Sequence, residues 1–133
     1  MSFKLDLFND FHLHGASAPE WNQRYVQLSP GAMQSSLVEA TSGNVHVFRK
    51  RMSEQVVQQG CVPAGKICFA VLSRNTFGTP RMQGRELRGD SLFILHGGDE
   101  FTIQRPKAME LLAVTFEGEE FRRLLDDRTV YKG

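Results

Sequence analysis

The stretch SLFILHGGDEFTIQ, residues 91–104, decides the fold. Two short runs rich in large apolar residues flank the turn residues Gly97-Gly98-Asp99, a pattern typical of two strands joined by a hairpin turn. The glycine pair could also suggest a phosphate-binding loop. Such loops open a helix, however, whereas this pair separates two strand-like runs. We therefore predict a β-hairpin.

The same pattern of short apolar runs separated by turns continues on both sides of this hairpin. Residues 66–73, KICFAVLS, form a continuous apolar run that indicates a strand covered on both faces. Residues 53–59 fit a short helix or a strand equally well. The other predicted strands are 25–28, 33–41, 45–51, 82–87, 91–96, 101–104 and 109–116. Strands at this short, even spacing are typical of a barrel or a sandwich.

The two ends of the chain depart from the strand pattern. Residues 1–20 are predicted to form an irregular arm over the core, because Gly15 and Pro19 interrupt any regular element. Residues 117–133 are predicted to form an amphipathic helix and the start of a linker, because apolar residues recur there at i, i+3 and i+4. The expected architecture is mainly β: a closed β-barrel or jelly roll over residues 21–116, between the arm and the helix.

Composition limits the classes of function. The chain has 133 residues, 41% hydrophobic and 23% charged, as expected of one globular domain. Sixteen basic and fifteen acidic residues give a net charge of +1, which argues against this chain binding nucleic acid by itself. We find no membrane-spanning stretch and no secretory signal. Cys61 and Cys68 are expected to be free thiols, which favours a reducing, cytoplasmic location.

A resemblance to a known family emerges from the order of several motifs. The motifs are Trp21, Gln27-Leu28-Ser29-Pro30-Gly31, Phe48-Arg49-Lys50-Arg51, the turn and strand at 59–67, and the two-strand hairpin at 89–101. Their order from Trp21 to Leu125 resembles the sensor domain of AraC-type transcription regulators. The group it most resembles includes the regulators of ethanolamine utilisation.

The resemblance implies a cupin-like barrel that binds a small-molecule effector and a helix that mediates a homodimer. The residues expected at the dimer contact are Phe121, Leu124 and Leu125. It also implies a following DNA-binding domain with two helix-turn-helix units. This chain contains no helix-turn-helix, so we expect contact with DNA only through an attached domain.

Aromatic and polar side chains on the predicted strands are the candidates for effector binding. Aromatic residues would line a pocket and polar residues would orient the ligand. The candidates are Trp21, Gln27, Arg49, Arg51, Phe69, Phe93, His96, Glu100 and Phe101. Alternation along residues 45–51 places Arg49 and Arg51 on one face and His46, Phe48 and Lys50 on the other. The pattern does not show which face points inward.

A metal-dependent cupin enzyme, such as a small dioxygenase or isomerase, is the main alternative. His12 and His14 with Glu20, and His96 on a late strand, could supply two histidines and a carboxylate. The histidine pair, however, precedes the predicted barrel. A barrel filled by side chains, with a structural role, is a third possibility. We expect no metal, because the histidine pair lies in the arm, and no cofactor. Because the sequence lacks GxSxG, HExxH and Walker motifs, we also expect no catalytic residues.

Overall fold

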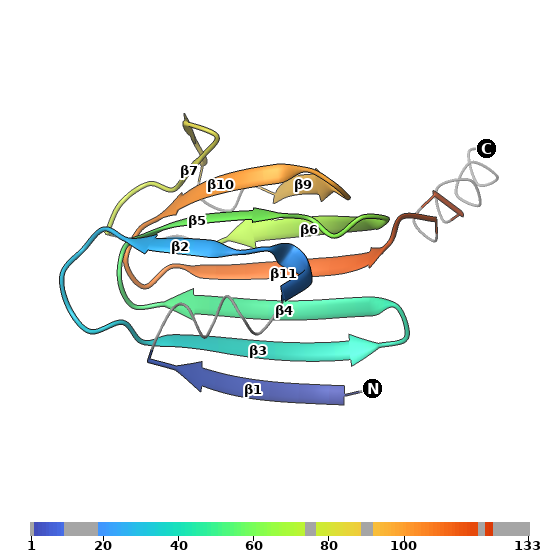
Figure 1. Ribbon diagram of the computed structural model, residues 1–133, viewed down its shortest axis with the longest axis horizontal. Helices are drawn as coiled ribbons and strands as arrows, with labels where there is room; N and C mark the ends of the chain where they lie inside the picture. The colour runs from blue at the N-terminus through green and yellow to red at the C-terminus, as the bar shows by residue number, and fades with distance from the viewer. Residues whose placement is uncertain (1, 10–18, 74–76, 89–91, 120–121, 124–133) are drawn as a thin grey trace.

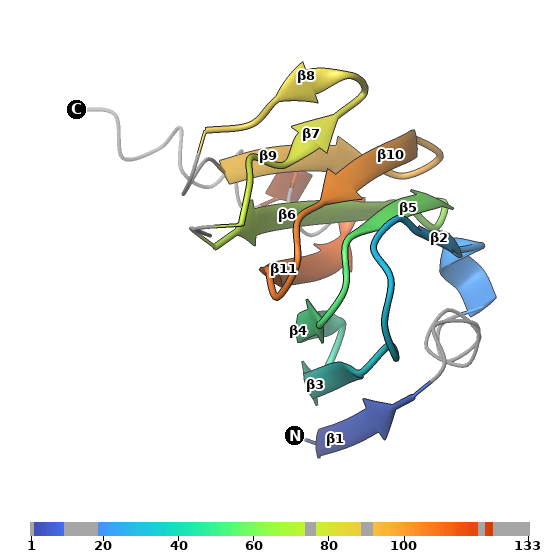
Figure 2. The ribbon, with the colours of Figure 1, turned by 90° about the vertical axis from the view of Figure 1, so that its left-hand side faces the viewer.

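The protein folds into two antiparallel sheets that pack against each other (Figures 1 and 2). The computed structural model describes residues 2–9, 19–73, 77–88, 92–119 and 122–123. The first sheet has the order β1-β3-β4-β11-β6-β9, and the second β2-β5-β10-β7-β8. Figure 2 shows the first sheet curving from β1 round to β9.

The bounds of the strands are as follows. The first sheet contains β1 (Ser2–Phe8), β3 (Ser35–Ser42), β4 (Val45–Met52), β6 (Lys66–Leu72), β9 (Leu92–His96) and β11 (Glu110–Glu117). The second contains β2 (Arg24–Gln27), β5 (Val56–Cys61), β7 (Arg81–Met82), β8 (Arg85–Glu86) and β10 (Glu100–Arg105). A 3-10 turn, Pro19–Trp21, precedes β2. The mostly β class is therefore confirmed, and the ambiguous region 53–59 resolves into strand β5.

The prediction of a closed barrel is wrong. Each sheet keeps its own edge strands, β1 and β9 in the first and β2 and β8 in the second. Closure would require a continuous ladder around the molecule. In the described residues β9 pairs with β6 and β10 pairs with β5 and β7, so no ladder joins the two sheets at this point. The architecture is an open sandwich.

The segment 91–104 shows why the sheets stay separate. Its two strands and its turn are as predicted, but β9 and β10 do not pair with each other, so the predicted hairpin ladder is wrong. The turn instead crosses between the sheets. Gly98 N donates to Val62 O at 2.9 Å, and Val62 N donates to Asp99 O at 2.9 Å. These bonds attach the crossing to the turn between β5 and β6.

Gly98 provides a test of this crossing. Its φ is 88°, and a Cβ added there would have no heavy atom within 4 Å. Gly98→Ala is therefore expected to lower the free energy of unfolding by about 1 kcal/mol through backbone strain alone. Gly98→Asn should lose less, because asparagine tolerates positive φ. Urea unfolding of the three proteins measures this, and an alanine variant as stable as the parent would contradict it.

The predicted irregular arm is also wrong over its first residues. Residues 2–8 form β1, an edge strand paired with β3 from Ser2 opposite Thr41 to Phe8 opposite Ser35. The segment SFKLDLF alternates polar and apolar residues with the period of a strand. The breakers at Gly15 and Pro19 lie beyond that run and do not affect it.

The predicted strand 82–87 is two short strands instead. Gln83 and Gly84, between β7 and β8, both have positive φ, 51° and 79°. Two successive positive values are characteristic of the type I′ turn of a tight hairpin. The Gln-Gly pair interrupts the strand, and only the glycine signals it in the sequence.

The C-terminal helix finds no support. Strand β11 continues through Glu117, where the helix was predicted to begin. The predicted dimer residues Phe121, Leu124 and Leu125 lie outside the described residues, so the homodimer stays a prediction. No helix in the described part of the chain is long and apolar enough to span a membrane.

The core lies between the sheets. On β4, Phe48, Lys50 and Met52 are buried whereas Arg49 and Arg51 are exposed, which settles the inward face of this strand. The outer face of the first sheet is also largely apolar. One row of register partners across its six strands is Phe3, Ala40, Val47, Val114, Phe69 and Ile94. This explains why β6 is a continuous apolar run.

Candidate functional site

A small cavity of about 20 Å³ lies between the two sheets. Its walls are mostly aromatic and aliphatic, with Trp21, Phe48, Phe93 and Phe101 as the aromatic members. Cavities of this volume have room for about one water molecule. As it stands, the interior is nearly filled by its own side chains.

The aromatic wall has a defined geometry. The Trp21 ring meets Phe48 edge-on, with centroids 5.8 Å apart and planes at 80°, and meets Phe101 at 6.2 Å and 70°. Such edge-to-face pairs are favourable beyond the area that they bury. Gly60 makes room for this packing, because a Cβ there would lie 2.7 Å from Phe101 Cζ. Trp21 is thereby held at the wall of the cavity by residues from both sheets.

Two polar residues, Lys50 of β4 and Gln58 of β5, line the cavity together with the aromatic residues, although nearly all of the cavity surface is apolar. Lys50 Nζ donates to Gln23 Oε1 at 3.1 Å and lies 5.2 Å from the centroid of the Phe48 ring. Gln58 Nε2 donates to the same Gln23 oxygen at 3.2 Å. The hydroxyl of Tyr25 donates to it as well.

Behind Gln58 lies a second buried cation, Arg105 of β10, with 1% of its surface exposed. Its guanidinium donates to Gln58 Oε1 at 3.0 Å and to the carbonyl oxygens of Lys50 and Met109 at 3.1 and 2.9 Å. We refer to Gln23, Tyr25, Lys50, Gln58 and Arg105 as the interior polar cluster. It joins β2, β4, β5 and β10 across the sandwich.

Burial perturbs the ionisable groups of this cluster. Desolvation, and then the charge of Arg105, lower the pKa of Lys50 from 10.5 to about 7. Desolvation also raises the pKa of Tyr25 and raises that of the nearby Cys68 thiol from 9.0 to about 11. At neutral pH the tyrosine and the thiol are therefore neutral, and Lys50 is close to its midpoint. An amine that exchanges its proton near pH 7 can respond to the charge of a ligand.

The residues predicted to bind an effector lie in several places. Trp21, Phe93 and Phe101 line the interior cavity. Gln27 instead stabilises the turn that follows β2, where its Nε2 donates to Ser29 O at 2.7 Å and to Gly31 O at 2.8 Å.

The other five predicted residues do not face the interior. Phe69 stacks on Phe116 at 5.5 Å on the outer face. His96 and Glu100 are exposed beside the β9–β10 turn, and Arg49 and Arg51 project outward from β4. The nine predicted residues therefore do not converge on one site.

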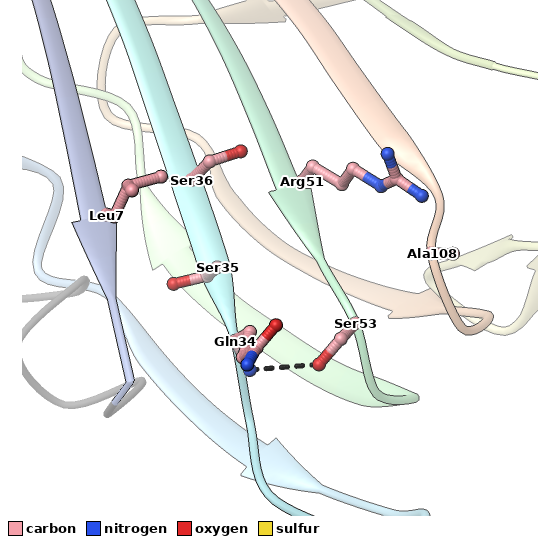
Figure 3. Close-up of a pocket in the computed structure, with 7 residues that line it drawn as sticks. All are labelled: Leu7, Gln34, Ser35, Ser36, Arg51, Ser53 and Ala108. Carbon is pink, nitrogen blue, oxygen red and sulfur yellow. Dashed lines mark hydrogen bonds between the residues drawn. The ribbon is translucent and has the colours of Figure 1, made fainter.

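Arg51 lies at a separate depression on the molecule's surface. Figure 3 shows it beside Ser36 and Ser53, near the ends of β3 and β4. This depression has a volume of about 400 Å³, and a hydrogen bond of 2.9 Å from Gln34 N to Ser53 Oγ closes one side. It is open and polar, and it lacks the aromatic walls of the interior.

Sequence reasoning missed Lys50, Gln58 and Arg105. Phe101, Ile103 and Arg105 share one face of β10, so a strand that buries the first two also buries the arginine. This alternation could have identified Arg105 as a buried residue from the sequence. For β4 the signal was ambiguous, because both faces carry basic residues.

The described residues do not form the metal site that the alternative function requires. His12 and His14 lie outside the described residues, and Glu20 and His96 are exposed. His96 faces Asp99, with Nδ1 3.8 Å from Oδ2. The described part of the chain contains no group of three or more histidine, cysteine, aspartate or glutamate residues that could hold a metal ion.

Fold and site together define a mostly β, two-sheet domain with a small aromatic cavity and a buried cationic cluster. No protein-family model and no curated protein matches the sequence. A predicted oxalate decarboxylase from Thermotoga maritima is similar in structure, with a TM-score of 0.47 and 12% identity over 75% of this chain and 96% of that chain. The Schizosaccharomyces pombe Cnp3 cupin domain has a TM-score of 0.35 and 15% identity over 77% and 71%. Similarities this distant define no activity for the chain.

Proposed function

We propose that this chain is a small-molecule-sensing domain, of the kind found in AraC-type transcription regulators, and that it binds its effector between the two sheets. The observation that carries the proposal is the buried amine of Lys50, a residue that lines the interior cavity. Transferring a charged amine into a protein interior costs several kcal/mol unless partners compensate. A core that served only for packing would be more stable with an apolar residue at position 50.

The placement of the cavity fits a sensing role. Phe93 and Leu95, which point inward from β9, are half-buried, and β9 is an edge strand paired only with β6 in the described residues. An edge strand with one partner can shift at lower cost than a central strand. A ligand that binds better to the shifted arrangement favours it, and this difference in affinity is what an attached DNA-binding domain would detect.

A thermal-shift screen of small metabolites tests the proposal. A ligand that binds only the folded chain raises its free energy of unfolding by RT ln(1 + [L]/Kd) and so raises the unfolding temperature. We expect at least one class of compound to raise the midpoint and to change the fluorescence of Trp21, the single tryptophan of the chain. If no class does both, the proposal fails. Chemical conversion of a bound compound, followed by NMR, would favour an enzyme instead.

A further inference from the structure

The interior polar cluster has a surplus of hydrogen-bond donors. Gln23 Oε1 accepts from Tyr25, from Lys50 and from Gln58, while Gln58 Oε1 is occupied by Arg105. The orientation of the Gln23 amide follows from this arrangement. If it were reversed, its NH₂ group would face the Lys50 ammonium and the Gln58 NH₂ group, which are both donors.

Several donors of the cluster are left without an acceptor. Gln23 Nε2 and Arg105 Nε are buried and have no hydrogen-bond partner among the described residues. The Lys50 ammonium carries three donors. Its described contacts are the single Gln23 oxygen and the face of Phe48. Buried donors without partners are uncommon in folded proteins, and here they gather in one region.

The cluster also has a surplus of positive charge. Neither Lys50 nor Arg105 forms an ion pair in the described part of the chain, and the partners of Arg105 are neutral oxygens. Glu39 and Glu20 act on Lys50 only as the weakest electrostatic influences, and Glu39 lies 3.7 Å from His46. When Lys50 is protonated, it and Arg105 are two buried cations that repel each other, and no described residue forms an ion pair with either of them.

We propose that the effector is a small monocarboxylate whose carboxylate accepts from Lys50 Nζ and whose apolar part lies among Trp21, Phe93 and Phe101. This inference rests on the proposed function and names the class of its ligand. A carboxylate supplies both the acceptor oxygens and the negative charge that the cluster lacks. The aromatic walls favour an apolar remainder over a sugar or a second charged group.

The small size of the cavity sets a condition on binding. A volume of about 20 Å³ does not hold a carboxylic acid, so the ligand displaces side chains that now fill the space. Phe93 and Leu95 are half-buried members of the wall, on the edge strand β9. Their displacement would couple occupancy to the position of β9.

Binding of an anion beside Lys50 has a definite dependence on pH. The titratable groups whose charge acts on the Lys50 amine are Arg105 of β10, Cys68 of β6, Glu39 of β3 and Glu20 of the 3-10 turn. The carboxylate favours the ammonium, so above the pKa of about 7 binding takes up a proton. The affinity should therefore fall about tenfold for each pH unit between pH 7.5 and 9 and level off below pH 7.

The test compares acids with their neutral amides. Acetate, propionate and benzoate are titrated against the full chain alongside acetamide, propionamide and benzamide, at constant ionic strength set with sodium chloride. Thermal midpoint and Trp21 fluorescence are the two readouts. We expect at least one acid to shift both and its amide to shift them at least tenfold more weakly.

Two variants locate the effect. Lys50→Met keeps the length and removes the charge, so the response to the acid should be lost while circular dichroism stays that of the parent. Lys66→Met is the matched control, since Lys66 pairs with Glu117 at 2.6 Å outside the cavity lining and its removal should leave binding unchanged.

Each outcome is decisive. An amide that binds as tightly as its acid overturns the carboxylate but leaves small-molecule sensing intact. Binding of the acid that survives in Lys50→Met overturns the placement. If no acid shifts either readout up to its solubility limit while another class of metabolite does, the ligand class is wrong. If no metabolite of any class binds, the proposed function itself is wrong.

Discussion

Raising the pH from 7 to 9 is expected to stabilise the folded chain by about 2 kcal/mol, through Lys50 alone. Burial lowers the pKa of its amine from 10.5 to about 7. In this range the unfolded chain keeps the proton on Lys50 while the folded chain releases it, and stability rises with pH wherever the unfolded state holds more protons. Urea unfolding at several pH values measures the increase.

The pH range is chosen to isolate Lys50. The pKa of Cys68 is raised from 9.0 to about 11 and that of Tyr25 is raised from 10.0. Above their unfolded values these two groups lose protons only in the unfolded chain, so each lowers stability as the pH increases. They begin to oppose Lys50 at about pH 9, where the measurement stops.

Lys50→Met separates the lysine from every other titrating group. The variant should show little change in stability between pH 7 and 9, because the group responsible is gone. At pH 7 it should be at least as stable as the parent, since an apolar side chain of similar length replaces a charge in the core. A parent whose stability is flat across this range would show that Lys50 reaches water in solution.

The sequence specified the strands better than their arrangement. Short apolar runs between turn residues located most strands to within one or two residues, as with β6 and β11. They could not show that the strands on either side of Gly97-Gly98 enter different sheets, because local alternation carries no information about the partner of a strand.

For a related reason, the sequence did not show which face of the first sheet points inward. Alternation identifies the buried face when the other face is polar. Here the outer face carries Val47, Val114 and Phe69 in one register row, so both faces are apolar at the centre of the sheet. On β4 the charged residues were equally uninformative, because Arg49 and Arg51 point outward while Lys50 points inward.

The candidate site was predictable only in its aromatic half. Trp21, Phe93 and Phe101 follow from the rule that large aromatic residues on strands line a core or a pocket. Lys50 and Arg105 contradict the rule that charged residues lie at the surface. Departures of this kind mark functional places in a fold, because they reduce stability unless a ligand or partner compensates them.

Arg105→Ala is expected to have the largest effect on folding of any substitution in the interior polar cluster. It leaves the carbonyl oxygens of Lys50 and Met109 and the Gln58 amide oxygen without their donor, and it opens a cavity. Relief of the repulsion between Arg105 and Lys50 offsets part of the loss. The net decrease in the free energy of unfolding should be about 3–5 kcal/mol, measured by urea unfolding at pH 7.

Two further variants are informative. Arg105→Met separates the contribution of the hydrogen bonds to stability from that of the side-chain volume, and Arg85→Ala is a surface control. Arg105→Met fills most of the space without donating, so it should recover the cavity part of the loss but not the rest. Because Arg105 lowers the pKa of Lys50, this variant should also reduce the rise in stability between pH 7 and 9. Arg85→Ala, at an exposed position on β8, should change stability by less than about 0.5 kcal/mol. If Arg105→Met were as stable as the parent, the three hydrogen bonds would contribute nothing, and Arg105 would be retained for charge alone.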